Sequence, residues 1–249
     1  MTEILQDSLP YDTGPRGLPG MRPLAVEDWL IKDEAFAAQM ALRARLLSEA
    51  PAAVLATSEA GREAADELLQ FVLDWLDQND RSYGISAKDV TRPDGVRVPV
   101  DRSDPMGTLG HLVQEDMCLM QKQGDAHVLT AAVLCFPASW RLADKIGRPL
   151  VAIHDPVPEY DDGLAKRVQR LFDGVQVGRP LWRFNALHYA QPDLHQPWRK
   201  DGDLSDTGAS PTYPYLRSER QSVLRLPETR ACVFAIHTFV VRTGPVTGP

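Results

Sequence analysis

The stretch from Val128 to Pro158, VLTAAVLCFPASWRLADKIGRPLVAIHDPVP, decides how this chain is interpreted. Its first part, Val128–Phe136, is a continuous apolar run of strand length, and Leu150–His154 indicates a second extended segment. His154 ends that segment and is followed at once by Asp155-Pro156-Val157-Pro158. The two prolines restrict the backbone, so the histidine ring can be held in one orientation and directed into a pocket.

Composition excludes some classes of protein. The 249 residues are 43% hydrophobic and 24% charged, which is typical of a globular protein with a sizeable core. A net charge of −7 without a Lys/Arg cluster argues against nucleic-acid binding, because phosphates need a basic surface. No apolar segment approaches the roughly 20 residues that span a bilayer. Cys118, Cys135 and Cys232 stand singly in apolar runs, so we expect reduced core thiols and a cytoplasmic protein.

The order of the expected elements indicates the fold class. Residues 1–24 have little periodicity and several prolines and glycines, so we expect an extended arm lying on the body. Three- and four-residue apolar spacings predict helices over about 26–47 and 58–76. Later in the chain, Arg217–Leu226 and Ala231–Val241 are predicted strands joined by a hairpin-like turn. Helices followed by an antiparallel sheet predict an α+β fold, with residues 25–249 as a single domain.

Shorter elements are expected between these regions. The pattern predicts short strands and turns over 83–104, a short helix over Trp140–Ile146, a helix over Gly163–Phe172 and a strand over Gly178–Tyr189. The segment Gln191–Pro214 is rich in proline and small polar residues. It therefore predicts a long loop that acts as a lid over the ligand pocket.

Several short strings, in order along residues 80–241, resemble the haem-dependent oxidative N-demethylase family. They are LVQEDMCLM at 112–120, CFPASW at 135–140, KIG at 145–147, IHDPVP at 153–158, RSERQ at 217–221 and LP at 226–227. The resemblance implies a haem b protein on an elaborated PAS-like fold. It also implies oxidative demethylation of an amine, dimethylamine in the characterised case, with molecular oxygen as co-substrate and an electron-donor protein as partner.

One departure from the family pattern bears on the substrate. The chain reads Arg183-Phe184-Asn185-Ala186, where the family pattern has a tryptophan at the position of Ala186. The smaller side chain predicts extra space in a substrate pocket lined by Asn185, Ala186 and His188, and hence an amine bulkier than dimethylamine. Two functions stay open: a haem-dependent oxidase or oxygenase acting on an amine-containing small molecule, and a non-catalytic PAS-like sensor that binds haem or another ligand.

His154 is the predicted iron ligand, because neutral imidazole is the usual protein ligand of haem iron. A core histidine bonded to a backbone carbonyl is the structural alternative. His111 and His237 are the rival ligands, and His188 and His195 are candidates for the distal side. His127, which precedes a strand, is expected at the surface.

Charged residues supply the remaining candidates. Glu115 and Asp116 interrupt an apolar segment, where a buried carboxylate is costly unless it is paired. We predict that one of them recognises a protonated amine or transfers protons, and the alternatives are a solvated edge or a buried salt bridge with Arg217 or Arg220. Arg217, Arg220 and Arg225 lie near or on a predicted strand, and one of them is predicted to pair with a haem propionate, with a plain surface salt bridge as the alternative.

Overall fold

The computed structural model describes residues 3–13, 20–150, 153, 162–197 and 213–244. His154 and most of the predicted lid lie outside these residues. The described part is an α+β structure centred on a seven-stranded antiparallel sheet with the order β1-β8-β9-β10-β6-β7-β2. A separate three-stranded sheet has the order β3-β4-β5.

The elements have the following bounds. The large sheet contains β1 (Arg22–Pro23), β2 (Leu55–Thr57), β6 (Asp116–Gln123), β7 (Ala126–Val133), β8 (Leu181–Tyr189), β9 (Tyr215–Arg225) and β10 (Cys232–Arg242). The small sheet contains β3 (Gly84–Ile85), β4 (Asp89–Thr91) and β5 (Arg97–Pro99). The helices are α1 (Phe36–Glu49), α2 (Pro51–Val54), α3 (Arg62–Asn79), α4 (Pro105–Leu112) and α6 (Asp162–Gly174), with 3-10 turns at Val26–Asp28, Glu59–Gly61 and Leu142–Asp144. Among the described residues, no helix is long and apolar enough to cross a membrane.

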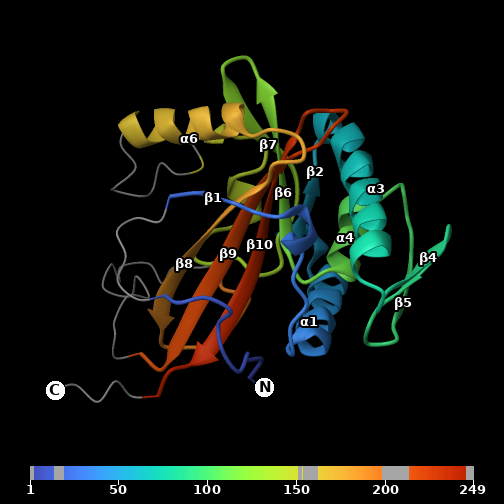
Figure 1. Ribbon diagram of the computed structural model, residues 1–249, viewed down its shortest axis with the longest axis vertical. Helices are drawn as coiled ribbons and strands as arrows, with labels where there is room; N and C mark the ends of the chain where they lie inside the picture. The colour runs from blue at the N-terminus through green and yellow to red at the C-terminus, as the bar shows by residue number, and fades with distance from the viewer. Residues whose placement is uncertain (1–2, 14–19, 151–152, 154–161, 198–212, 245–249) are drawn as a thin grey trace.

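The two faces of the large sheet are covered differently (Figure 1). Helices α1, α3 and α4 lie against one face, hereafter the helix face, and enclose the main core, in which Leu68 and Leu109 pack with Leu119. Helix α6 crosses one end of the opposite face, and its Phe172, together with Val175 directly after the helix, belongs to a smaller apolar cluster. The part of this open face formed by β8 and β9 carries polar side chains instead.

The first predicted helix begins about ten residues later than expected. Residues 26–28 form a 3-10 turn only, and α1 starts at Phe36. Between the 3-10 turn and α1, backbone N–H and C=O groups bind side chains from distant parts of the chain instead of forming helical hydrogen bonds. Arg220 donates to the carbonyls of Asp28 and Trp29, and the N–H of Ile31 donates to Glu115. These tertiary contacts compete with the helical pattern, and the apolar residues become buried without a helix.

Three other predicted elements also differ. The second helix runs over Arg62–Asn79, so it starts about four residues and ends about three residues later than predicted. The segment Trp140–Ile146 contains only a 3-10 turn, which ends before Gly147 at φ +74°. Leu150 and Ile153 are helical, not extended, because the N–H of Ile153 donates to the carbonyl of Pro149 at 3.1 Å. Pro149 is suited to the start of such a turn.

The hairpin of β9 and β10 is confirmed and has an unusual neighbour. Beyond Ile236, β10 is paired with β9 but no longer with β6. Gln6 from the N-terminal arm takes the place of a strand there: its N–H donates to the carbonyl of Val240 and its side-chain Oε1 accepts from the N–H of Val240. Gln39 of α1 donates to the carbonyl of Thr238. The arm thus protects the free edge of β10.

Candidate functional site

Asp116 lies at the start of β6 in a fully buried position. One carboxylate oxygen is 2.6 Å from Nη1 of Arg43, whose side chain is also fully buried. The backbone N–H groups of Cys135 and Phe136 donate to the carboxylate at 2.7 Å each. Every oxygen of Asp116 therefore has a partner within the protein, and the partner cation is Arg43 rather than Arg217 or Arg220.

Glu115 belongs to a second buried charged group on the helix face. His237 of β10 lies between two carboxylates, with Nδ1 3.1 Å from Glu115 and Nε2 3.0 Å from Asp33. Burial opposes a charge on the ring, but the hydrogen bonds and charges of the two acids dominate and raise the pKa of His237 to about 9. Both ring nitrogens are engaged, so His237 has no nitrogen left for iron in this arrangement.

The other described histidines are placed as follows. His127 is buried, not exposed as expected, and its Nδ1 is 2.7 Å from the amide of Gln169. His188 has Nδ1 3.1 Å from the carbonyl of Tyr213. His111, near the end of α4, is partly buried, and burial together with the charges of nearby arginines lowers its pKa. None of these three rings lines the groove or the pocket described in the next paragraphs.

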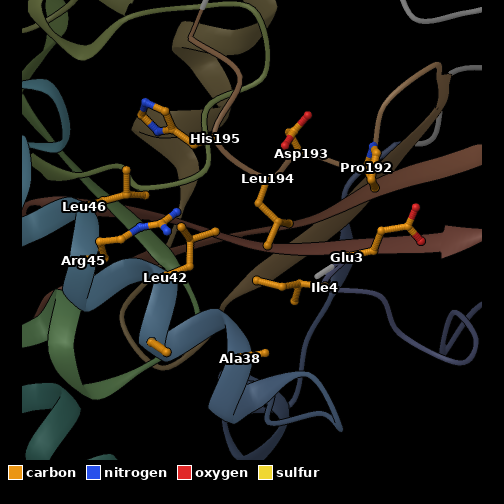
Figure 2. A pocket seen from close by; sticks show the side chains of 11 residues that line it. Glu3, Ile4, Ala38, Leu42, Arg45, Leu46, Pro192, Asp193, Leu194 and His195 are labelled. Atoms are coloured by element: carbon orange, nitrogen blue, oxygen red, sulfur yellow. The ribbon is translucent and has the colours of Figure 1, made fainter. Parts of the chain in front are cut away.

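His195 lines a groove of about 580 Å³ between α1 and the segment after β8 (Figure 2). Arg45 and His195 lie toward one end of the groove and Glu3 toward the other, with Leu42 and Leu194 between them. Nδ1 of His195 is 2.8 Å from the carbonyl of Cys135. This contact fixes the ring and leaves Nε2 without a hydrogen bond from the described residues, which is the usual arrangement of a metal-binding histidine.

A polar row crosses the open face of β8 and β9. Arg217, Glu219 and Gln221 alternate along β9, so their side chains share one face. Asn185 and Arg183 lie on the paired strand β8, opposite Glu219 and Gln221 respectively. Oε2 of Glu219 accepts hydrogen bonds from the side-chain amides of Asn185 and Gln221, both at 3.1 Å, while Nε of Arg183 donates to Gln221 at 2.8 Å.

This row lines a second cavity of about 150 Å³, hereafter the Glu219 pocket. Its lining residues are Ala138, Ser139, Trp140, Asn185, Leu187, Tyr189, Arg217 and Glu219. Ser139 has φ +64°, in the left-handed region that non-glycine residues rarely adopt. Its N–H donates to the carbonyl of Gln196, which fixes the strained backbone beside the pocket. Strain of this kind is concentrated at functional sites.

Arg217 and Arg220 point to opposite faces of the sheet. Arg220 lies on the helix face and donates to the carbonyls of Asp28 and Trp29. Arg217 lines the Glu219 pocket and donates to the carbonyls of Phe136 at 2.7 Å and Leu194 at 2.9 Å. Its Nε is buried and has no hydrogen-bond partner among the described residues. Of the two arginines, only Arg217 therefore offers a donor to a ligand on the open face.

The structure does not bring together the three residues predicted to line a substrate pocket. Asn185 lines the Glu219 pocket, as do Leu187 and Tyr189. Because side chains alternate along a strand, Ala186 and His188 point to the helix face. Ala186 pairs with Ser218, whose hydroxyl is 2.9 Å from that of Tyr11 in the N-terminal arm. A substitution at 186 would meet this arm rather than the Glu219 pocket.

Comparison with known families decides how these cavities are interpreted. The family described as haem-dependent oxidative N-demethylase, alpha subunit-like, matches residues 20–246. The chain belongs to this family. The match spans both cavities, apart from Glu3 and Ile4 of the larger one, and it includes His154 and the polar row. Membership indicates a haem-dependent oxidative protein of the N-demethylase type.

The sequence analysis did not identify Glu219 or Arg43 as site residues. Glu219 lies within the quoted string Arg217–Gln221, and the alternation of Arg217, Glu219 and Gln221 was a readable signal for a shared polar face. No sequence pattern indicated a role for Arg43, because an arginine in an amphipathic helix is usually an ordinary polar residue. Its partner Asp116 is 73 positions away in the chain.

Proposed function

We propose that this protein carries out a haem-dependent oxidation of a small amine on the open face of the sheet. The single observation that carries the proposal is the Glu219 pocket. It joins a carboxylate, a buried arginine donor and two aromatic side chains, Trp140 and Tyr189, within the region matched by an oxidative haem family. Haem b would supply the chemistry of oxygen activation when it is bound.

The residues present fit such a cofactor. We propose His154 as the iron ligand, with molecular oxygen as co-substrate and electrons from a partner protein. His195 is a described histidine that also suits this role, because it lines a cavity and Cys135 holds one ring nitrogen while leaving the other open. The unpartnered Nε of Arg217 is a donor suited to a propionate, since a guanidinium binds carboxylates strongly.

The protein's own groups have distinct roles in this proposal. Arg217 and Asn185 orient groups in the pocket, and the backbone around Ser139 shapes its wall. Glu115 and Asp116 act indirectly: they hold β6, β10 and the residue 28–33 segment in register through His237, Arg43 and the backbone. We infer a PAS-like arrangement for the sheet, and the buried free cysteines are consistent with a reducing, cytoplasmic environment.

The first experiment is an absorption spectrum of the purified protein followed by oxygen uptake. We expect a Soret band in the isolated protein and amine-dependent oxygen consumption when a chemical or enzymatic electron donor is supplied. Analysis of the products for formaldehyde tests the demethylation outcome. A protein that expresses in haem-replete cells without a Soret band would contradict the proposal. Haem binding with no amine-dependent turnover would instead favour the sensor function.

Two histidine variants identify the iron ligand. We expect His154→Ala to lose most bound haem while the far-ultraviolet circular dichroism stays unchanged, because one strong bond is removed but little core volume. His195→Ala is the matched control and should retain haem. The reverse result would assign the iron to His195 and to the larger groove. Retention of haem by both variants would rule out both histidines as the essential ligand.

A further inference from the structure

One carboxylate oxygen of Glu219 accepts hydrogen bonds from the described residues and the other does not. The amides of Asn185 and Gln221 both donate to Oε2. Oε1 accepts no hydrogen bond from the described residues, and its nearest cation, Nη2 of Arg217, is 3.6 Å away. The side chain is 12% exposed and lines the pocket. The two amides thus lock the carboxylate in one orientation, and the second oxygen remains available to a donor.

Arg217 forms an ion pair with this carboxylate but no hydrogen bond. Its Nη1 and Nη2 are directed at the carbonyls of Leu194 and Phe136, at normal hydrogen-bond distances. The 3.6 Å separation from Glu219 is longer than a hydrogen bond. A ligand donor at 2.7–2.9 Å from Oε1 would make the closer, charge-assisted contact that Arg217 does not make.

The pocket walls favour a cation with apolar substituents. Trp140 and Tyr189 both line it, and aromatic faces attract alkylammonium groups through their quadrupole. The ring of Tyr189 already has the guanidinium of Arg217 5.9 Å from its centre, so it accepts a cation in this setting. Leu187 adds apolar surface. The cavity has a volume of about 150 Å³, which suits a small ligand.

We propose that Glu219 is the residue that binds the substrate's ammonium group, with Trp140 and Tyr189 contacting its alkyl substituents. The proposal rests on the proposed function and assigns its amine recognition to the open face. Asn185 and Gln221 are positioning residues, because they hold Glu219 and leave Oε1 free for the substrate N–H. The preferred ligands are small secondary and tertiary alkylammonium ions.

Calorimetric titration of the purified holoprotein with dimethylammonium and trimethylammonium chloride tests the proposal without turnover. Glu219→Gln keeps the size of the side chain and removes its charge. We expect binding to weaken roughly 10- to 100-fold, the usual effect of losing a hydrogen bond to a charged group. Asp193→Asn is the matched control, because Asp193 is an exposed carboxylate of the larger groove. It should leave the affinity unchanged.

A second variant separates a local effect from a folding defect. Trp140→Leu should weaken alkylammonium binding by a smaller factor, roughly 2- to 30-fold. Glu219→Gln should keep the Soret band and the melting temperature of the wild type, which shows that its loss of affinity is local. Equal affinity of wild type and Glu219→Gln, or no binding of either ion to wild type, would overturn the assignment. A protein without haem that still binds these ions through Glu219 would overturn the proposed function and leave the assignment standing.

Discussion

The two faces of the sheet hold two polar clusters that differ in access. On the helix face, Asp33, Glu115 and His237 form one buried charged group and Arg43 and Asp116 form another. On the open face, Glu219 lies in a row of amides and arginines beside a cavity. Each cluster contains a carboxylate oxygen without a hydrogen bond from the described residues, Oε2 of Glu115 and Oε1 of Glu219.

The difference lies in what surrounds these oxygens. Glu115 is 2% exposed, lies against His237 and lines neither the larger groove nor the Glu219 pocket, so a ligand in either cavity does not reach it. Glu219 is less buried and lines a pocket. A carboxylate in an apolar stretch of sequence therefore says little about function until its partners are known. The helix-face cluster is expected to govern stability and the open-face cluster to govern binding.

The largest effect is expected at Asp116. Asp116→Asn leaves Arg43 buried without its counter-charge, which typically costs about 3–5 kcal/mol of unfolding free energy. Urea denaturation followed by circular dichroism measures this loss. The matched variant on the other face, Glu219→Gln, should change the unfolding free energy by less than about 1 kcal/mol, because that carboxylate is partly solvated. Similar losses in the two variants would remove the distinction between the faces.

A pH titration of stability tests the His237 group. The pKa of His237 in the folded protein, about 9, is raised above the ordinary value of 6.5, so the stabilisation from its charged ring is complete below pH 6.5 and is lost as the pH rises through about 9. At about 1.4 kcal/mol per pKa unit, the loss is on the order of 3 kcal/mol. Asp33→Asn should flatten this dependence because it removes one of the two acids. A wild-type stability that is constant from pH 6.5 to 9.5 would contradict the charged assignment.

A smaller effect is expected at Ala186. Its side chain points toward the arm residue Tyr11, so Ala186→Trp should overpack this contact and lower the unfolding free energy by about 1–3 kcal/mol. Thermal unfolding measures the change, and Ala186→Ser serves as a control of similar size. Alkylammonium affinity should stay at the wild-type value. A selective loss of affinity without a loss of stability would place Ala186 in the substrate pocket, as the sequence pattern predicted.

The fold could be predicted best where the signal is local. The strands at 217–226 and 231–241 were placed within about two residues, because their apolar runs and the turn between them are contiguous in the chain. The start of α1 was missed because the carbonyls of Asp28 and Trp29 bind Arg220, about 190 residues away. Long-range contacts of this kind leave no trace in the local pattern.

The candidate site was only partly predictable for the same reason. The sequence leaves open whether Glu115 and Asp116 lie at a solvated edge or in a buried ion pair, and both are buried. Their partners, His237 and Arg43, come from elements far away in the sequence. The two-residue alternation of a strand does place Arg217 and Glu219 on the same face. The alternation alone does not indicate which face of the strand borders a cavity.

The contact between Gln6 and β10 has a consequence for how this protein behaves in concentrated solution. Six residues of β10, from His237 to Arg242, have a strand on only one side, and their outward backbone groups are the kind that recruit a second chain. Gln6 forms hydrogen bonds with both backbone groups of Val240 on this edge, as a neighbouring strand would do. We expect release of the arm by a proteolytic nick to expose these backbone groups to strand addition by a second chain.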